Sequence, residues 1–234
     1  MDPARIASLL VPFLGPDSLT KQQLAQVSTY LDLLLKWNAR INLTSVRQPE
    51  EILARHFGES FFTARQLFPA GHPERSAGPR GGPSAVEGPL HSSTGLDVID
   101  LGSGAGFPGL PIRIYGPAVR TTLIESNHKK AAFLREIIRA LTLTDVDVFA
   151  GRAESFPGTA AIVTLRAVEK PQRALAIAAR LVSPGGRLVL LLGASQAGNA
   201  RGLLPGFSWT PPVALPGSSR RVMLVGASFL KEPE

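Results

Sequence analysis

The chain has 234 residues, 44% of them hydrophobic, with a net charge of +7 and no cysteine. This length suits one ordinary domain with a small satellite, and no apolar run reaches the roughly 18 residues that a membrane-spanning helix needs. The lack of cysteine excludes disulfides, cysteine-based zinc sites and a cysteine nucleophile. The positive charge favours a polyanionic partner. The N-terminus has no pattern of a secretory signal, so we expect a soluble cytoplasmic protein rather than a membrane-spanning one.

The first 70 residues predict an all-helical cap. Thr20, followed three residues later by Gln23, forms a capping-box pattern that begins a helix continuing to about residue 35. Apolar residues recur along it at helical spacing, so one face packs against another element. A second helix begins at Pro49 and continues to about Leu67.

Residues 71–95 have a different composition. They include 6 Gly, 4 Pro and 4 Ser, and their only large aliphatic residues are Val86 and Leu90. Such a segment cannot bury enough apolar surface to offset the entropy lost on ordering. We predict a flexible insertion between the cap and the rest of the chain.

Residues 96–234 alternate between short apolar runs and amphipathic helical patterns. Strands are predicted at residues 96–102, 120–126, 146–151, 160–166, 187–193 and 220–229, and helices at 109–116, 129–141 and 171–181. This alternation is typical of an α/β fold with a doubly wound, mainly parallel sheet and helices on both faces. The segment holds 16 basic and 10 acidic residues, so most of the excess positive charge lies here.

A glycine-rich loop follows the first of these strands. It reads DLGSGAGFPG over residues 100–109 and opens a helix. Gly102, Gly104 and Gly106 permit a tight turn and let the backbone approach a ligand closely. The helix N-terminus offers unpaired N–H groups to an anionic end of that ligand. The loop therefore predicts a cofactor site at the carboxyl end of the first strand.

Two classes of cofactor fit this loop. From Gly104 onward it reads GxGxxG, which allows a nicotinamide dinucleotide. Glu125 ends the second strand and is placed to hold the ribose hydroxyls of either cofactor. Glu154 follows the third strand and is placed to read an adenine amino group. Together with Asp100, these acids favour S-adenosylmethionine, which has no pyrophosphate to neutralise, and the dinucleotide stays an alternative.

Several side chains are candidates for positioning reactants or RNA. Arg166 ends the fourth strand, where ligands of α/β sheets gather, and it could pair with a methionine carboxylate, with Glu154 or with an RNA phosphate. His56 in the cap could stack on RNA or serve as a buried structural histidine. The arginines that could contact RNA are Arg40, Arg47, Arg135, Arg220 and Arg221.

A set of motifs spread along the chain points to one family. The motifs are Lys36-Trp37-Asn38, Ile41-Asn42-Leu43-Thr44, Arg55-His56, the stretch from Leu101 to Pro111, Glu125-Ser126, Gly151-Arg152-Ala153-Glu154 and Arg166-Ala167. Through most of its length the chain resembles the bacterial small-subunit ribosomal RNA guanine-N7 methyltransferases, also known as the glucose-inhibited division protein B family.

The resemblance implies a Rossmann-like class I methyltransferase domain at residues 96–234, with an N-terminal helical cap at 1–70. It implies S-adenosylmethionine as the cofactor and 16S ribosomal RNA or the small ribosomal subunit as the partner. We expect no metal, no membrane contact and a monomer. The loop and the resemblance together give a cofactor site made of Asp100, Gly102, Ser103, Gly104, Gly106, Phe107, Glu125, Ala153, Glu154 and Arg166.

The available chemistry is consistent with methylation of guanine N7. This atom has an exposed lone pair, so no general base is required, whereas methylation of pyrimidine carbon-5 commonly needs a cysteine. The Asn/Asp-Pro-Pro-aromatic loop of amine methyltransferases is not present after the fourth strand, where the chain reads LRAVE. The alternatives are a nicotinamide-dependent oxidoreductase and a non-catalytic, basic RNA-binding module with a degenerate cofactor loop.

The chain departs from the family pattern in three places. Glu59 stands where the family's His-x-x-Asp-Ser motif has Asp, and Leu192 stands where a Lys is usual. The insertion at 71–95 is longer than the usual connection. We expect these departures to affect substrate affinity more than cofactor binding.

Overall fold

The computed structural model describes residues 1–68, 96–166 and 171–229. The insertion predicted at 71–95 lies outside the described residues. Across the described ranges, no helix combines the length and apolar character that a membrane span requires. The same ranges contain no group of three or more His, Asp or Glu side chains arranged to hold a metal ion.

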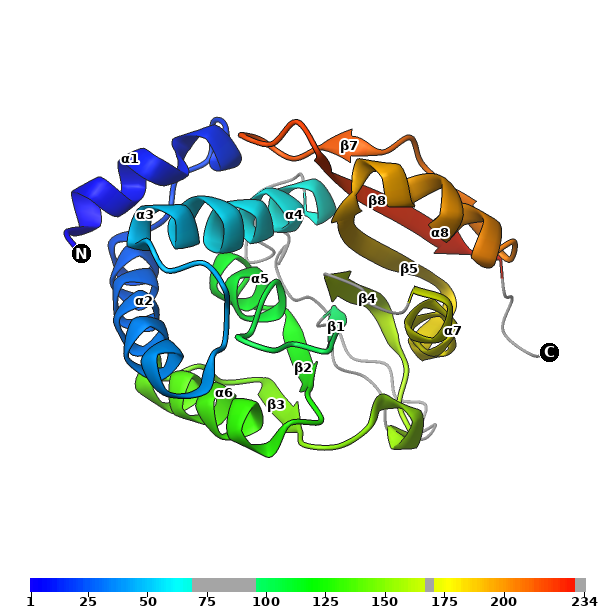
Figure 1. The fold of residues 1–234 in the computed structure, drawn as a ribbon, viewed down its shortest axis with the longest axis horizontal. Helices are drawn as coiled ribbons and strands as arrows, with labels where there is room; N and C mark the ends of the chain where they lie inside the picture. Colours follow the sequence, from blue (N-terminus) through cyan, green and yellow to red (C-terminus); the bar gives the residue numbers. More distant parts are fainter. Residues whose placement is uncertain (69–95, 167–170, 230–234) are drawn as a thin grey trace, which may run out of the picture.

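An eight-stranded sheet forms the centre of the described molecule (Figure 1). Its strands lie in the order β3-β2-β1-β4-β5-β8-β6, and β7 pairs with β8. Strands β1 to β5 are parallel, and β8 runs antiparallel to β5, β6 and β7. The predicted α/β fold with a mainly parallel sheet is confirmed. The strands are β1 (Asp97–Leu101), β2 (Arg120–Ile124), β3 (Val146–Phe149), β4 (Ala160–Arg166), β5 (Val182–Gly193), β6 (Phe207–Trp209), β7 (Val213–Ala214) and β8 (Arg221–Ser228).

The order of the strands places a crevice at the end of β1. This strand pairs with β2 on one side and with β4 on the other. The chain builds the sheet outward from β1 through β2 to β3 and then crosses back to β4 on the opposite side of β1. Open α/β sheets bind ligands at such a point, outside the carboxyl ends of the strands. The glycine loop emerges from β1 here and leads into helix α5 (Gly109–Tyr115).

Helices cover both faces of the sheet because successive strand residues point to opposite faces. Along β4, Ile162 belongs to the core under α5 and α6, whereas Val163 belongs to the core under α7 and α8. Helix α6 spans His128–Ala140, α7 spans Pro171–Leu181 and α8 spans Ala197–Leu203.

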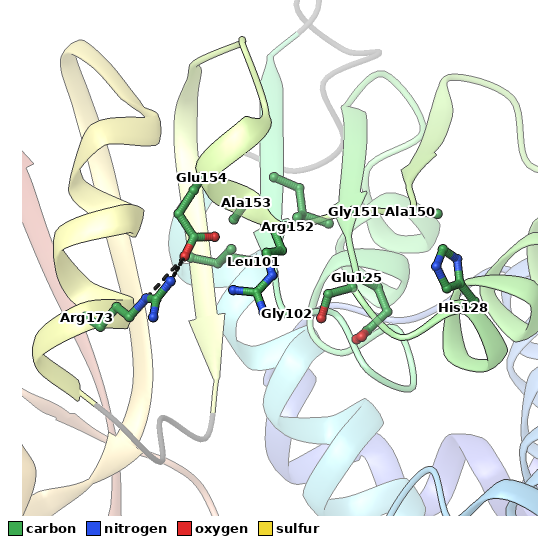
Figure 2. Close-up of a pocket in the computed structure, with 12 residues that line it drawn as sticks. Leu101, Gly102, Glu125, His128, Ala150, Gly151, Arg152, Ala153, Glu154 and Arg173 are labelled. Carbon is green, nitrogen blue, oxygen red and sulfur yellow. Dashed lines mark hydrogen bonds and ion pairs between the residues drawn. The ribbon is translucent and has the colours of Figure 1, made fainter.

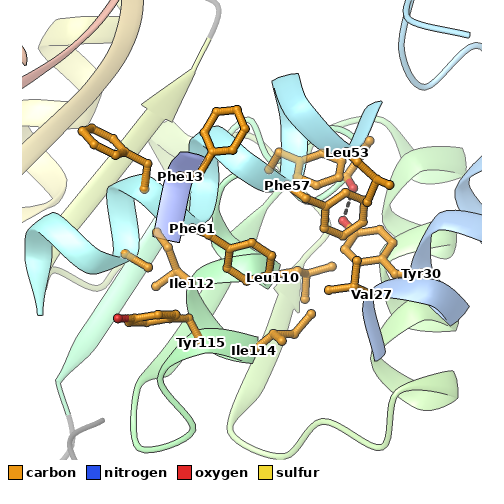
Figure 3. Packing of buried hydrophobic residues seen from close by; sticks show 14 of the residues in the cluster. Phe13, Val27, Tyr30, Leu53, Phe57, Phe61, Leu110, Ile112, Ile114 and Tyr115 are labelled. Atoms are coloured by element: carbon orange, nitrogen blue, oxygen red, sulfur yellow. Dashed lines mark hydrogen bonds between the residues drawn. The ribbon is translucent and has the colours of Figure 1, made fainter. Parts of the chain in front are cut away.

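The helical cap packs on the face that carries α5 and α6. In Figure 3, Tyr30, Phe57 and Phe61 of the cap lie with Leu110 and Tyr115 of α5 in one cluster. The rings of Phe61 and Tyr115 have centroids 6.5 Å apart. Cap and sheet therefore share one core. The cap elements are α1 (Pro3–Leu14), α2 (Lys21–Ile41), α3 (Pro49–Ile52), the π-helical segment η1 (Leu53–Gly58) and α4 (Glu59–Leu67).

Local sequence signals located most elements, with differences where backbone geometry is irregular. The capping box is present, since Gln23 N donates to Thr20 Oγ1 and Thr20 N donates to Gln23 Oε1. The single helix predicted over 49–67 contains the π-helical turn η1. Strand β5 begins at Val182 rather than at the predicted residue 187, and Gly185 within it has a φ of +69°. Helices α1 and α8 and strands β6 and β7 are not among the predicted elements.

Candidate active site

The glycine loop is anchored to the neighbouring strand. Gly102 N and Ser103 N both donate to the carbonyl oxygen of Ile124, over 2.9 and 3.1 Å. Gly102 has a φ of +68°, and a Cβ at this position would meet no atom within 4 Å. The backbone at Gly102 therefore borders open space rather than packed protein. Gly102 lines two adjoining pockets, which we name pocket A and pocket B.

Gly106 has a different reason to be glycine. Its φ is +90°, and a Cβ there would lie 2.6 Å from Leu110 Cδ1 and also against the hydroxyl of Tyr30. Gly106 lines neither pocket A nor pocket B. Packing between the loop and the cap thus accounts for this glycine without a ligand. Gly104, with a φ of +59°, uses its N–H to bind Glu125.

Pocket A has a volume of about 660 Å³ and lies over the ends of β1, β2 and β3 (Figure 2). Its wall contains two carboxylates, Glu125 and Glu154, which come from different loops. Ala153, which precedes Glu154, also lines this pocket. Besides Gly102, three predicted cofactor residues therefore line pocket A: Glu125, Ala153 and Glu154. The lining residues are Leu101, Gly102, Ile124, Glu125, Ser126, His128, Ala150, Gly151, Arg152, Ala153, Glu154 and Arg173.

Backbone N–H groups hold the carboxylate of Glu125. Its Oε2 accepts from Gly104 N over 2.9 Å, and its Oε1 accepts from Asn127 N over 2.7 Å. The residue is only 7% exposed. Each carboxylate oxygen has a second lone pair, so the group can accept hydrogen bonds from two ligand hydroxyls without releasing the loop.

An arginine that the sequence analysis did not assign fixes Glu154. Arg173, in the first turn of α7, donates from Nε to Glu154 Oε1 over 3.2 Å, and its Nη2 contacts the same oxygen. This hydrogen bond lowers the pKa of Glu154. Arg180 of the same helix donates to the carbonyl oxygens of Ala153 and Glu154. Helix α7 thus holds the loop after β3 at its backbone and at its carboxylate.

Asp100 lies beneath the loop and lines neither pocket. It is 1% exposed, and its carboxylate accepts from Thr164 Oγ1 over 2.7 Å and from Gly109 N over 3.2 Å. Burial raises the pKa of Asp100 to about 6. Ser103, which lines pocket B, donates from Oγ to the backbone carbonyl of Asp100. These contacts hold β1, β4 and the start of α5 together under the site.

Pocket B has a volume of about 600 Å³ and lies between the cap, the glycine loop and the ends of β4, β5 and β8. Its described wall contains four cationic side chains and no acidic one. Leu192, where the resemblance leads one to expect a lysine, is part of the wall. The lining residues are Leu43, Thr44, Ser45, Val46, Arg55, His56, Gly102, Ser103, Ala105, Phe107, Lys130, Arg166, Leu191, Leu192, Gly193, Gln196 and Arg221.

His56 and Phe107 stack on one another in this wall. Their ring centroids are 5.0 Å apart, and Phe107 also stacks on Tyr30, with centroids 5.3 Å apart. His56 Nε2 shares a 2.8 Å hydrogen bond with Thr44 Oγ1. Burial and the nearby charge of Arg166 lower the pKa of His56 to about 2. His56 is therefore neutral near pH 7 and supports the loop rather than carrying charge.

Arg166 does not pair with Glu154, one of the three partners considered from the sequence. Its Nη2 donates to the carbonyl oxygen of Arg55 over 2.6 Å and to Glu59 Oε2 over 3.3 Å. The same Glu59 oxygen accepts from Nη2 of Arg221. Burial lowers the pKa of Arg166 to about 10, which leaves the guanidinium charged near neutral pH.

Of the five arginines assigned to RNA, Arg221 is the one in the wall of pocket B. Arg40 and Arg220 are exposed and line neither pocket A nor pocket B, and Arg47 donates to Asn38 O and Asn42 Oδ1 in the cap. The fifth, Arg135, lines a separate hollow between α6 and β3. Two cations of pocket B, Arg55 and Lys130, were not assigned as site residues, although Arg55 lies in the Arg55-His56 motif named above.

Comparisons with known proteins decide which family this site represents. The family model described as GidB, rRNA small subunit methyltransferase G, matches residues 23–70 and 84–203. The chain belongs to this family. Ribosomal RNA small subunit methyltransferase G of Chloroflexus aggregans is 35% identical over 230 residues, covering 92% of this chain and 86% of that protein. The protein of the same name from Xanthomonas campestris pv. campestris is also 35% identical, over 82% of this chain and 79% of its own length.

Solved structures agree with this fold. TrmN from Thermus thermophilus superposes with a TM-score of 0.53 at 20% identity, over 75% of this chain and 53% of that one. TYW2 from P. horikoshii, in complex with MeSAdo, has a TM-score of 0.50 at 16% identity and covers 58% of each chain. Membership in the rRNA small subunit methyltransferase G family confirms the predicted class, an S-adenosylmethionine-dependent rRNA methyltransferase. It does not support the nicotinamide oxidoreductase or the non-catalytic module.

Proposed function

We propose that this member of the methyltransferase G family transfers the methyl group of S-adenosylmethionine to N7 of a guanine in 16S ribosomal RNA. The observation that carries the proposal is the meeting of pockets A and B at Gly102, where a side chain would enter open space. One pocket offers fixed carboxylates and the other offers cations. A cofactor in the first and an RNA strand in the second would therefore meet at the glycine loop.

Pocket A fits the adenosine part of the cofactor. The carboxylate of Glu125 is held so that its free lone pairs can accept from two ribose hydroxyls. Glu154 could accept from the adenine amino group if Arg173 keeps its carboxylate oriented. When bound, the cofactor supplies an activated methyl group on a sulfonium, so the chain mainly has to align two reactants.

Pocket B suits a reaction without proton removal. A general base needs a pKa near the working pH, but His56 has a pKa of about 2, and the described lining contains no carboxylate. Guanine N7 has a free lone pair, and its methylation moves the positive charge from the sulfonium to the purine. We therefore expect a methylation rate that is flat between about pH 6.5 and 8.5, whereas a general base would give a rising limb.

The product can be mapped directly. Unmethylated small subunits and free 16S ribosomal RNA are each incubated with the protein and labelled S-adenosylmethionine, then reduced and treated with aniline, which cleaves at N7-methylguanine. The expected result is label in RNA with a matching strand break at one guanine. Label in RNA without cleavage would contradict the N7 assignment, and label only in protein would contradict the RNA substrate.

A further inference from the structure

A single buried carboxylate joins two arginines in the wall of pocket B. Glu59 begins α4 and is 2% exposed. Its Oε2 accepts from Nη2 of Arg166 at the end of β4 and from Nη2 of Arg221 at the start of β8. The side chains of these arginines are 11% and 22% exposed, and that of Glu59 is 3% exposed. The contact thus connects the cap to the ends of β4 and β8 that border pocket B.

The charges at this point are not balanced. Two guanidinium groups share one carboxylate, and Arg55 and Lys130 add positive charge in the same wall. The carboxylate that pairs with Arg55 belongs to Glu51, whose side chain is 46% exposed. Buried charges are stable only when they are paired. An excess of partly buried positive charge beside an open pocket is therefore a site for an incoming anion.

The geometry leaves hydrogen-bond donors for that anion. Arg166 uses its Nη2 for both Glu59 and the Arg55 carbonyl, and Arg221 uses its Nη2 for Glu59. A guanidinium carries five N–H donors in a planar fork, which matches the oxygens of a phosphate or a carboxylate. Two such forks held side by side can bind one oxyanion from two directions.

We propose that Glu59 is a positioning residue that holds Arg166 and Arg221 together as a two-arginine clamp for an oxyanion in pocket B. This inference rests on the proposed function, which supplies two sources of that chemistry. One is a backbone phosphate of the RNA strand beside the target guanine. The other is the carboxylate at the amino-acid end of the cofactor.

The length of the Glu59 side chain is part of the proposal. One carboxylate oxygen contacts both arginines, which come from strands on opposite sides of β5. Aspartate is shorter by one carbon–carbon bond, about 1.5 Å, so from the same backbone it keeps the charge but loses the simultaneous contact. A residue that only balanced charge would tolerate this change, whereas a positioning residue would not.

The test uses the full chain with Glu59→Gln and Glu59→Asp, and Glu50→Gln as the matched control. Glu50 lies in the same part of the cap, and its ion pair with Arg5 is at the surface. Thermal melting first establishes that each variant is folded. Binding of S-adenosylhomocysteine, of 5′-methylthioadenosine, which lacks the amino-acid part, and of 16S ribosomal RNA is then measured over a range of salt.

If the clamp binds phosphate, both Glu59 variants lose about tenfold in RNA affinity and about one unit of the salt slope, while cofactor affinity is unchanged. If it binds the carboxylate, S-adenosylhomocysteine affinity falls about tenfold and 5′-methylthioadenosine affinity does not change. Simple charge removal in Glu59→Gln would instead tighten RNA binding. Tighter RNA binding by Glu59→Gln would overturn the proposed clamp. So would Glu59 variants whose affinities for all three ligands equal those of Glu50→Gln.

Arg221→Lys provides a second variant if the Glu59 variants do not fold. Lysine keeps the charge but not the fork, so the clamp predicts weaker binding of the same ligand, whereas a site that needs only charge predicts no change. These binding measurements do not depend on which atom of the RNA is methylated. If the binding results match the clamp but the product mapping finds no N7-methylguanine, the proposed function is contradicted and the clamp is not.

Discussion

Pockets A and B share the backbone of Gly102 but hold their charged side chains in different ways. In pocket A each carboxylate has its own partners: backbone N–H groups bind Glu125, and Arg173 binds Glu154. Two arginines in the wall of pocket B share one buried carboxylate, that of Glu59, which does not itself line the pocket. Pocket A therefore suits neutral hydroxyl and amino groups that donate hydrogen bonds, and pocket B suits an anion. The difference in charge separates the two ligands across one loop.

The largest expected effect is on pocket A alone. Glu125→Ala removes two acceptors for ribose hydroxyls and the acceptor for Gly104 N, so cofactor affinity should fall by roughly 1.5–3 kcal/mol, or about 10- to 150-fold. Calorimetry with S-adenosylhomocysteine measures this change. RNA affinity of the same variant should stay within about twofold of the wild type. An equal loss of affinity for the cofactor and for RNA would show that the two pockets do not bind their ligands independently.

Asp100 lies beneath the glycine loop that borders both pockets. We expect it to act on both ligands alike, through the stability of the folded protein. Its folded pKa of about 6 is above its ordinary value of 3.8, so the folded state binds the proton more tightly than the unfolded chain. Its contribution to stability is present in full below about pH 4 and is lost as the pH rises to about 6, by up to about 2–3 kcal/mol.

Asp100→Asn removes this titration. The free energy of unfolding of the variant, relative to the wild type, should therefore rise between about pH 4 and pH 6.5. Denaturant unfolding at several pH values measures the difference. A constant difference across this range would mean that Asp100 does not titrate in the way its burial implies.

The smallest expected effect concerns the exposed side of pocket A. Arg173→Ala removes an ion pair whose members are 67% and 41% exposed, and such pairs contribute little. We expect cofactor affinity to fall by less than about threefold, compared with the much larger loss in Glu125→Ala. A loss as large as that of Glu125→Ala would show that the orientation of Glu154, rather than ribose binding, dominates pocket A.

The sequence was sufficient to predict the loop, the parallel sheet and the places of Glu125, Glu154 and Arg166, because these follow from local patterns and from the rule that ligands gather at the carboxyl ends of strands. The contacts of Glu59 could not be predicted in this way. It lies 107 residues from Arg166 and 162 residues from Arg221. Periodicity gives the face of a helix but not which distant side chain meets it.

The irregular segments were also hard to predict. The π-helical turn at 53–58 immediately precedes Glu59 and contains Arg55 and His56, and π-helical turns often occur at functional sites. Its sequence is compatible with an ordinary helix, so no composition signal marks it. At Gly106 the sequence signal had a different cause. The glycine suggested close approach to a ligand, but the hydroxyl of Tyr30 occupies the space where a side chain would lie.

The most direct test of the two-pocket account is the salt dependence of both ligands on one protein sample. Four cations in pocket B predict that RNA affinity falls about 50-fold between about 50 and 200 mM salt, since each neutralised phosphate releases counterions. S-adenosylhomocysteine, held mainly by hydrogen bonds in pocket A, should change by less than about twofold. Parallel salt dependence of the two affinities, or RNA binding that does not depend on salt, would contradict the assignment of the RNA to pocket B and of the adenosine part of the cofactor to pocket A.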